Sequence, residues 1–390
     1  KQGCPLDCGP CEWHVSGLSL PVFSITNDCN LNCPKCFTFN RPDQRYYKTV
    51  EETKAIIDHI VKASDGVQLI NLTGGEPTLH PDLFKIIEAC KHEKIKRTTM
   101  NTNGIRLAQD IEFARQIKQS GVQLVLNIDT LNPETSERMY GRDITDLKSK
   151  ALEVIEELDI PATILLVAAL DVNEKEVAEL TAGLIRKSFV RSITIQNMTF
   201  TGKNGSDFEP RRRLPIDQME RLLCELPEFR REDFFPLGSY HPLCYSVAYY
   251  LHLDGILISL SKFFDRETLT ELTQGKYLLE PDRQFSTNFM DGLNKMWSDN
   301  EDPKTIKAMK NFMTEFFSSE NLMSDEERRS RIEKKVKMVY IHPHMDKDNF
   351  DLDRVGRCGD LVPDESGNMI PACSYNLLYR QKDPRFWVEE

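Results

Sequence analysis

The sequence lacks a stretch that could cross a membrane. Its longest run without Asp, Glu, Lys or Arg covers residues 234–253, and this run contains two prolines, a glycine and four tyrosines. A spanning helix needs about 20 predominantly apolar residues, and this mixture of polar and helix-breaking residues does not suit one. We therefore predict a protein with no membrane span.

The sequence also lacks an excess of basic residues. It has 50 Lys and Arg against 61 Asp and Glu, a net charge of −11, and residues of the two signs are interspersed rather than gathered in blocks. Proteins that bind a phosphate backbone normally carry a basic patch. The charge balance therefore argues against a nucleic-acid partner.

Cysteine is too scarce for a disulfide scaffold, with 11 residues in a chain of 390. Clustered cysteines in a reducing compartment usually bind metal, so we expect a cytoplasmic protein with metal sites. Six cysteines lie within the first 36 residues and repeat the spacing C-x3-C-x2-C. They are Cys4, Cys8 and Cys11 in the first copy and Cys29, Cys33 and Cys36 in the second.

The second copy follows an apolar run and lies in a predicted loop. Its three thiolates could hold three irons of a 4Fe–4S cluster and leave the fourth iron open to another ligand. A catalytic metal needs such an open position, whereas a structural site is usually closed by four protein ligands. A zinc knuckle is the alternative, although zinc sites more often use paired C-x2-C half-sites.

Residues 20–200 alternate short β-branched runs with amphipathic segments, the pattern of repeated βα units. Strands are predicted at 20–26, 67–72, 96–101, 122–128, 162–169 and 192–197, and helices at 50–63, 81–92, 107–119, 145–158 and 173–187. Six strands with intervening helices indicate an α/β fold, a partial (β/α)6 TIM-type barrel.

Polar residues follow several of these strands, at the rim of the barrel where chemistry gathers. Glycines here would let the backbone approach a ligand closely, and Glu76 could accept hydrogen bonds from an ammonium group. The amide and acid side chains are candidate partners for carboxylate and hydroxyl groups, and strand-end capping explains them equally well. The residues are Thr73, Gly74, Gly75, Glu76, Asn101, Asn127 and Asp129.

The loop from Cys29 to Cys36, with Gly74-Gly75-Glu76 downstream, resembles the radical SAM superfamily. The signature of that family is C-x3-C-x-φ-C with an aromatic or apolar φ; here Lys35 stands at φ and Phe37 follows the third cysteine. The resemblance implies that the three thiolates bind a 4Fe–4S cluster whose open iron chelates S-adenosylmethionine (SAM). It also implies that the Gly-Gly-Glu motif contacts the amino group of SAM, and that reduction yields a 5′-deoxyadenosyl radical.

The other cysteines raise the predicted number of clusters to two or three. Cys4, Cys8 and Cys11 are predicted to hold one, with Asp7 or His14 as a fourth ligand; a distorted zinc site or flexible thiols are the alternatives. Cys244, Cys358 and Cys373 lie among turn-forming and polar residues and are predicted to hold another, completed by His342 or His344. Single cysteines are most often inert packing residues, the role assigned to Cys90 and Cys224.

Two further segments make the family resemblance more specific. They are residues 4–11 and residues 345–376, the second with Arg357-Cys358 and Ile370-Pro371-Ala372-Cys373. Together they resemble the archaeal tetraether synthases, also described as class D radical SAM methylases. This implies C–C bond formation or methylation on a lipid or apolar small molecule, with an electron donor such as ferredoxin or flavodoxin. The chain departs from that family at Ser19, where its members have cysteine, and it has no rubredoxin-like cysteine pairs.

A segment rich in Met and Phe offers a hint about the substrate. Met309, Phe312, Met313, Phe316 and Phe317 recur at helical spacing and form one apolar face. Such a face is either an ordinary core-facing helix or a lid for an alkyl chain or an apolar peptide.

We predict four parts: an N-terminal cluster segment (1–19), the barrel (20–200), a linker (201–235) and a C-terminal region with an auxiliary cluster that covers the substrate (236–390). Two other functions fit less well. A peptide-modifying radical SAM maturase would usually have more C-terminal cysteines. A non-catalytic iron–sulfur or zinc protein would have no use for the Gly-Gly-Glu rim.

Overall fold

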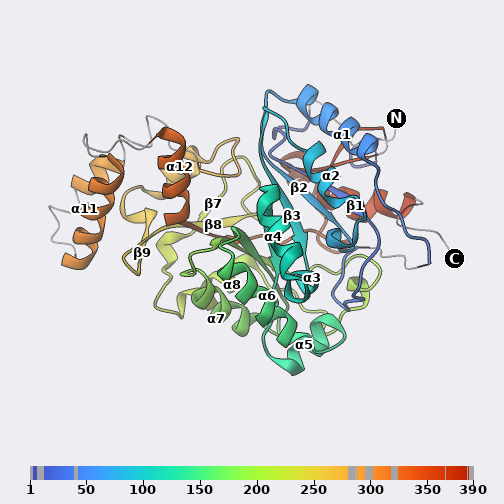
Figure 1. The fold of residues 1–390 in the computed structure, drawn as a ribbon, viewed down its shortest axis with the longest axis horizontal. Coiled ribbons are helices and arrows are strands. Elements are labelled where there is room, and N and C mark those ends of the chain that lie inside the picture. The colour runs from blue at the N-terminus through green and yellow to red at the C-terminus, as the bar shows by residue number, and fades with distance from the viewer. Residues whose placement is uncertain are drawn as a thin grey trace.

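The computed structural model describes residues 3–6, 13–38, 43–279, 287, 289–294, 302–317, 324–364, 366–383 and 385. Its centre is a run of six parallel strands separated by helices (Figure 1). The strands are β1 (Leu20–Thr26), β2 (Val67–Gly74), β3 (Ile95–Thr102), β4 (Gln123–Asn127), β5 (Ala162–Ala168) and β6 (Val190–Asn197). They confirm the predicted α/β class and the partial barrel.

Helices follow each of the first five strands and cover the sheet. They are α1 (Val50–Ala63), α2 (Leu83–Ala89), α3 (Ile105–Gln109), α4 (Ile111–Ser120), α5 (Pro133–Tyr140), α6 (Thr145–Glu157) and α7 (Glu174–Leu184). Local sequence explains their ends: Thr49 and Glu52 form a capping box at the start of α1, and Gly121 ends α4 at a φ of 77°. The helix α5 was not predicted.

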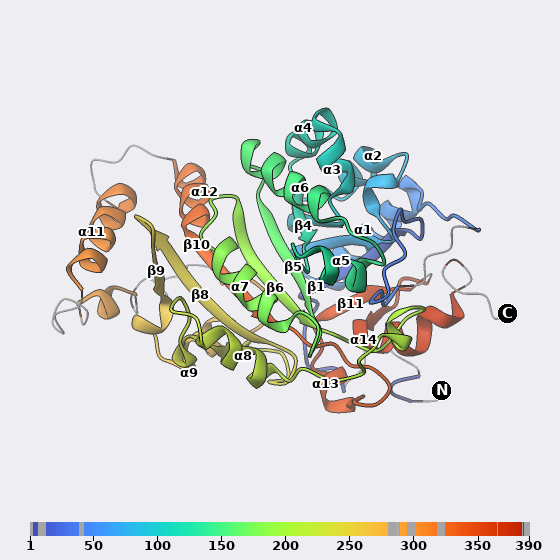
Figure 2. The ribbon, with the colours of Figure 1, turned by 90° about the horizontal axis from the view of Figure 1, so that it is seen from below.

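The C-terminal region continues the same sheet at both edges. Its elements are α8 (Ile216–Cys224), β7 (Phe235–Pro236), β8 (Ser246–Leu253), β9 (Ile256–Ser259), α9 (Arg266–Leu272), α11 (Pro303–Phe317), α12 (Asp325–Lys335), β10 (Val336–Ile341), α13 (Leu352–Gly356), β11 (Asp360–Pro363), β12 (Met369–Pro371) and α14 (Ala372–Ser374). The strand β10 pairs parallel with β6, and β11 pairs parallel with β1. The sheet order is therefore β12-β11-β1-β2-β3-β4-β5-β6-β10-β8-β7, and Figure 2 shows its curvature.

Two hairpins form in the C-terminal half of the chain. The strands β8 and β9 form an antiparallel hairpin around Asp254 and Gly255, and β11 and β12 form another around Gly367. The segment 201–235, predicted as a linker, contains the helix α8.

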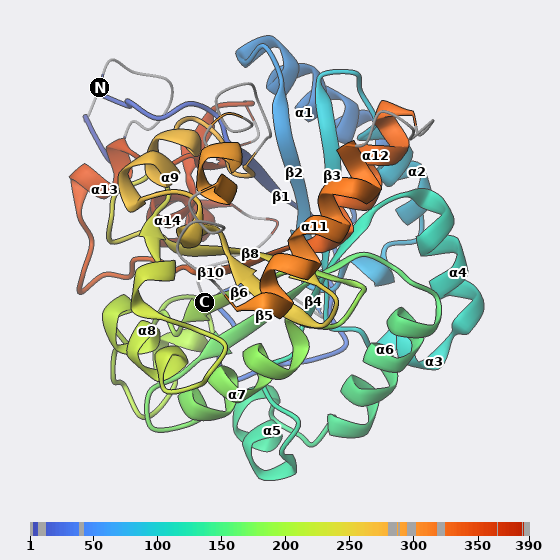
Figure 3. The same ribbon diagram turned by 90° about the vertical axis from the view of Figure 1, so that its left-hand side faces the viewer.

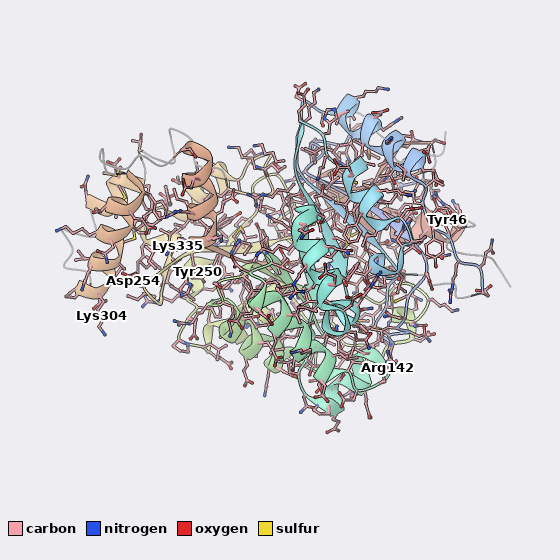
Figure 4. The ribbon with its side chains drawn as sticks, in the orientation of Figure 1. Tyr46, Arg142, Tyr250, Asp254, Lys304 and Lys335 are labelled. Carbon is pink, nitrogen blue, oxygen red and sulfur yellow. The ribbon has the colours of Figure 1, made fainter. Side chains whose placement is uncertain are left out.

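Helix α11 packs its apolar face against the β8–β9 hairpin, at the front of Figure 3 together with α12. Met309, Phe312 and Phe316 are buried there, and Met313 is partly buried. Asn311 Nδ2 also donates to Asp254 Oδ2 at 3.1 Å, and Asp254 is labelled at the far end of the molecule from Tyr46 in Figure 4. For these residues the structure favours the core-facing interpretation over the lid; the side chain of Phe317 lies outside the described residues.

The main core fills the space between the sheet and its helices. It includes Ile70 and Leu72 of β2 and Leu124 and Leu126 of β4, each of which is fully buried. Within the described ranges, no helix is long and apolar enough to span a membrane.

Candidate functional site

The cysteine loop leaves β1 and makes hydrogen bonds at two of its sulfur atoms. Leu31 N donates to Cys29 Sγ at 3.4 Å, and Thr38 Oγ1 lies 3.0 Å from Cys36 Sγ. Cys36 N donates to Cys33 O at 3.1 Å, which closes the turn between the last two cysteines. Hydrogen bonds to sulfur favour its thiolate form, the form that binds metal.

Charges around the loop show that the three sulfurs are neighbours. Burial, followed by the charge of Glu76, raises the pKa of the Cys29 thiol, and Cys36 and Cys33 raise it further. Burial also raises the pKa of Cys33, whereas Lys35 and Lys148 lower it. The fold thus gathers the three predicted ligands into one partly buried group flanked by cations.

The donor set at this site is three thiols from one loop. In the described part of the chain, no group of three or more His, Cys, Asp or Glu side chains could hold a metal ion. A 4Fe–4S cluster bonds each thiolate to a different iron, so its thiolates stand farther apart than the ligands of one ion. Three partly buried thiols in one loop, with lysines nearby, suit the cluster; their role as its ligands stays a prediction.

The Gly74-Gly75 pair lies against the strand end that carries the cysteine loop. A Cβ atom on Gly74 would lie 2.2 Å from Thr26 O, and one on Gly75 would lie 2.1 Å from Asp28 O. Gly75 N donates to Thr26 O at 2.9 Å. The glycines therefore permit two backbone segments to meet, a physical reason different from the ligand approach that we predicted.

Glu76 is an almost completely buried acceptor, with 1% of its surface exposed. Its Oε1 accepts hydrogen bonds from Thr78 N, Thr78 Oγ1 and Thr102 Oγ1, and its Oε2 accepts from Asn103 N at 2.7 Å. The carboxylate ties the loop after β2 to the loop after β3. A further contact of Glu76 with an ammonium group stays a prediction.

The remaining predicted rim residues lie at adjacent strand ends. Thr73 is opposite Ser24 of β1. Asn101 Oδ1 accepts from Asn71 Nδ2 at 3.0 Å. Asn127 Nδ2 donates to Asp129 Oδ1 at 2.7 Å, and Val167 N also donates to this oxygen. Strand-end contacts thus account for Asn101, Asn127 and Asp129; cofactor binding by any of the four stays a prediction.

Lys35, the unusual residue of the motif, points into this rim. Its ammonium group pairs with Asp129, lies 3.3 Å from Asn127 Oδ1 and stands 4.7 Å from the centre of the Tyr140 ring. Lys148 of α6 lies 4.5 Å from the same ring centre and donates to Asn103 O and Asn127 O. Burial lowers the pKa of Lys35 to about 7 and that of Lys148 to about 8, whereas the nearby thiolates act in the opposite direction.

The three C-terminal cysteines line one cavity. Cys244 precedes β8, Cys358 precedes β11 and Cys373 lies in α14. The other polar residues of its wall are Tyr240, His342, His344, Arg354 and Asp360. Segments more than a hundred residues apart in sequence thus bring the predicted auxiliary set together.

Contacts inside this cavity distinguish the two candidate histidines. His344 Nδ1 lies 3.6 Å from Cys373 Sγ, whereas His342 Nε2 lies 3.6 Å from Asp360 Oδ2. Arg354 Nε donates to Cys244 Sγ at 3.3 Å. Burial raises the pKa of Cys358 and of Cys373, and the neighbouring cysteines add to both shifts. His344 is therefore the histidine placed beside the thiols.

The two cysteine sites adjoin each other. The rings of Phe37, next to Cys36, and His344 stack with centroids 6.4 Å apart. The Arg380 guanidinium, from the C-terminal segment, lies 5.8 Å from the centre of the Phe37 ring. It also interacts electrostatically with Cys36. The C-terminal region thus forms one wall of the first site.

The N-terminal cysteine set is only partly described. Cys8, Cys11 and Asp7 lie outside the described residues, and Cys4 is exposed. His14 Nε2 makes a hydrogen bond with Cys358 O at 2.9 Å, so the segment after this set docks beside the C-terminal cavity. Cys90 is fully buried in the main core and Cys224 packs against it, as predicted.

Sequence reasoning missed Lys148, Tyr140, Arg380 and Asp360. Each comes from an element whose position beside the cysteines depends on the tertiary fold. Only Lys35 carried a signal in the sequence, because it replaces an aromatic or apolar residue within the motif.

Comparison with known proteins identifies the class of protein to which the barrel is related. Residues 23–182 match the model of the radical SAM superfamily. This part of the chain is therefore a radical SAM domain; enzymes of that superfamily use a 4Fe–4S cluster and SAM.

More specific relatives are archaeal enzymes. The chain is 27% identical to 7,8-dihydro-6-hydroxymethylpterin dimethyltransferase of Methanocaldococcus jannaschii, over 98% of this chain and 81% of the relative. It is 39% identical to a probable GTP 3′,8-cyclase of Methanococcus maripaludis over 34% of this chain, and it spans 44% of that relative. Among solved structures, Streptococcus suis SuiB bound to S-adenosylmethionine aligns with a TM-score of 0.43 and 23% identity, over 53% of this chain and 46% of SuiB.

Proposed function

We propose that this enzyme functionalises an unactivated carbon of a lipid or an apolar small molecule, by methylation or by C–C bond formation. The observation that carries the proposal is the C-terminal cavity, where Cys244, Cys358 and Cys373 meet beside the first cysteine loop. The alignment with a pterin dimethyltransferase over nearly the whole chain supports methylation over other radical chemistry.

In this proposal, Cys29, Cys33 and Cys36 hold the catalytic 4Fe–4S cluster, and the rim from Thr73 to Asp129 binds SAM. When bound, the reduced cluster and SAM supply a 5′-deoxyadenosyl radical that takes a hydrogen atom from the substrate. Glu76 fixes two rim loops relative to the cysteines through its four hydrogen bonds. Burial of the site keeps water from the reacting carbon.

The C-terminal cysteines hold an auxiliary cluster, with His344 as its fourth ligand, and Cys4, Cys8 and Cys11 hold another. An auxiliary cluster beside the catalytic one offers an electron donor or acceptor for the substrate radical. His344 fits this role because its ring lies between Cys373 and Phe37. A small electron carrier such as ferredoxin or flavodoxin supplies the reducing electron in the cytoplasm.

Anaerobic iron and sulfide quantification tests the clusters. Three clusters predict about twelve irons per chain in reconstituted wild type. Triple alanine substitution at Cys29, Cys33 and Cys36, or at Cys244, Cys358 and Cys373, should each remove about four of them. Substitution of Cys90 and Cys224 by alanine is the matched control and should remove none. Zinc in place of iron would overturn the proposal.

Product mass tests the reaction. The enzyme is incubated anaerobically with SAM, dithionite and, in separate assays, an archaeal lipid extract or the hydroxymethyl dihydropterin. A gain of CH2 in the substrate marks methylation, and a loss of two hydrogens marks joining of two carbons. 5′-Deoxyadenosine must form with wild type and not with the variant that lacks Cys29, Cys33 and Cys36. A peptide-modifying enzyme would be favoured instead if neither substrate class is modified and 5′-deoxyadenosine is released only when a peptide is added.

A further inference from the structure

Gln196 lies near the end of β6 and faces the inside of the barrel. The side chains of Ile193 and Ile195 belong to the main core between the sheet and its helices. Because successive side chains of a strand point to opposite faces of the sheet, Gln196 points away from this core. His342 N donates to Ile195 O at 2.8 Å and extends the pairing of β6 with β10. The segment after β10, which carries His344, therefore runs beside Gln196.

The side chain of Gln196 meets the ring of His344 across 148 residues of sequence. Gln196 Nε2 lies 3.3 Å from His344 Nε2. The other ring nitrogen, His344 Nδ1, lies 3.6 Å from Cys373 Sγ in the C-terminal cavity. The His342 ring packs beside that of His344, with the ring centroids 4.3 Å apart. The imidazole is thus held between an amide of the barrel and a thiol of the cavity.

The position of the ring proton decides which nitrogen of His344 can bind a metal. A histidine that binds through one nitrogen carries its proton on the other, and a hydrogen-bond partner normally holds that proton in place. Nδ1 faces the thiol of Cys373, so Nε2 is the nitrogen that carries the proton when His344 acts as a ligand. The amide of Gln196 has an oxygen as well as an NH2 group, and this oxygen can accept from Nε2–H. In the part of the chain that the structure describes, no other group hydrogen-bonds to Nε2.

The carboxylate in the cavity wall has other partners. Asp360 accepts hydrogen bonds from Tyr240 Oη at 2.8 Å and from Tyr245 Oη at 2.6 Å. Its Oδ2 also lies 3.6 Å from His342 Nε2. The orientation of the His344 ring therefore depends on a neutral amide of the barrel rather than on this acid.

We propose that Gln196 is a positioning residue for the auxiliary site. It fixes the ring of His344 and keeps the ring proton on Nε2, so that Nδ1 is presented to the site of the three C-terminal cysteines. This inference rests on the proposed auxiliary cluster with His344 as its fourth ligand. It gives the inner face of the barrel a part in building a site whose other ligands come from the C-terminal region.

The test measures the coupling between the reduced cluster and a histidine nitrogen, by pulsed electron paramagnetic resonance on protein that contains isotope-labelled histidine. The protein is reconstituted anaerobically and reduced with dithionite, without SAM. Wild type should show a strong coupling, and His344→Ala should lose it. Gln196→Met keeps the length of the side chain but removes the amide, and it should weaken or abolish the coupling. Gln196→Glu keeps an acceptor oxygen and should retain the coupling.

Gln123→Met is the matched control. Gln123 belongs to β4, where its neighbour Leu124 is in the main core, so its side chain also faces the inside of the barrel. Its side chain makes no hydrogen bond within the described ranges, and its replacement should leave the coupling unchanged.

The outcomes separate this inference from the proposed function. An unchanged coupling in Gln196→Met, at equal iron content, would overturn the inference and leave His344 as a ligand. Loss of the coupling from Gln123→Met, or from Gln196→Glu as well as Gln196→Met, would also overturn it, because the effect would then come from packing rather than from the acceptor. A wild type that holds its iron but shows no histidine coupling would instead overturn the proposed role of His344 as a ligand.

Discussion

Glu76 shows how one side chain can fix several loops. Its carboxylate is buried and accepts four hydrogen bonds, from the residues after β2 and β3. In Glu76→Gln, one acceptor oxygen is replaced by an NH2 group, which is itself a donor. This group must face another donor, either Asn103 N or the donors that now bind Oε1. We expect a loss of about 1–3 kcal/mol in the free energy of unfolding, measured by urea denaturation.

The control for this substitution is Glu88→Gln, at an exposed side chain that pairs with Lys91. It should change the free energy of unfolding by less than about 0.5 kcal/mol. Equal stabilities for the Glu76 and Glu88 variants would contradict the organising role of Glu76.

Lys337 of β10 provides a pH-dependent stability. Its ammonium is buried and donates to Lys187 O and Val190 O, and burial lowers its pKa from 10.5 to about 7. Because the folded pKa lies below the unfolded one, the unfolded chain binds more protons between these values. Stability contributed by this group therefore rises as the pH increases from about 7 towards 10.5.

The measurement compares wild type with Lys337→Gln by urea denaturation at several pH values. The free energy of unfolding of wild type, relative to the variant, should increase from pH 7 to pH 10. Lys304→Gln, at an exposed position (Figure 4), should show no such trend. A difference that stays flat over this range would mean that Lys337 titrates normally in the folded protein.

At the scale of elements, the loop after β6 clamps the cysteine loop. Gly205 N donates to Cys36 O at 2.9 Å, and Asn204 Nδ2 donates to Cys33 O at 3.0 Å. Gly202 has a φ of 85°, and a Cβ atom there would lie 2.2 Å from Phe37 O. Gly202→Ala should therefore displace the cysteine loop, lower the melting temperature and reduce iron uptake.

Gly183→Ala is the matched control. Gly183 lies within α7, and a Cβ atom there would meet no heavy atom within 4 Å. This substitution should leave iron uptake unchanged and stabilise the protein by about 0.5–1 kcal/mol, because alanine favours a helix. Normal iron uptake in Gly202→Ala would show that the cysteine loop tolerates a shift of its neighbour.

The elements also show how much of the fold could be predicted from the sequence. The period-2 and helical patterns predicted the six barrel strands, because the alternation of apolar residues is local. The missed helix α5 had its own signals, since Asn132 caps it, Pro133 begins it and Gly141 ends it. The pairing of β11 with β1 and of β10 with β6 could not be predicted, because it joins residues that are distant in sequence.

The candidate site also has parts that could be predicted from the sequence and parts that could not. The spacing of Cys29, Cys33 and Cys36 predicted a common site because three residues in one loop are necessarily close. The meeting of Cys244, Cys358 and Cys373 was predicted only from their polar surroundings, and the fold places them in one cavity. Arg380 carried no signal, because its place beside Phe37 depends on how the C-terminal segment packs.

At the scale of the whole molecule, an ion pair joins the segment after β6 to the C-terminal region. Arg213 makes two hydrogen bonds to the fully buried carboxylate of Asp346, at 2.6 Å and 2.5 Å. Phe200 N, from the loop after β6, donates to the same carboxylate. The pair thus links the loop that clamps the first cysteine site to the segment that carries His344.

Arg213→Gln should loosen this link, because it leaves a buried carboxylate without its cation. We expect a loss of about 2 kcal/mol in the free energy of unfolding, moderated because about a third of the Arg213 side chain faces solvent. Amide hydrogen exchange should accelerate in residues 342–358 and in the loop after β6. Arg212→Gln, at an exposed pair with Asp171, is the control and should change neither quantity. Faster exchange in only one of the two segments would show that the two cysteine sites are held independently. Faster exchange in both segments would show that the barrel and the C-terminal region position their cysteines together.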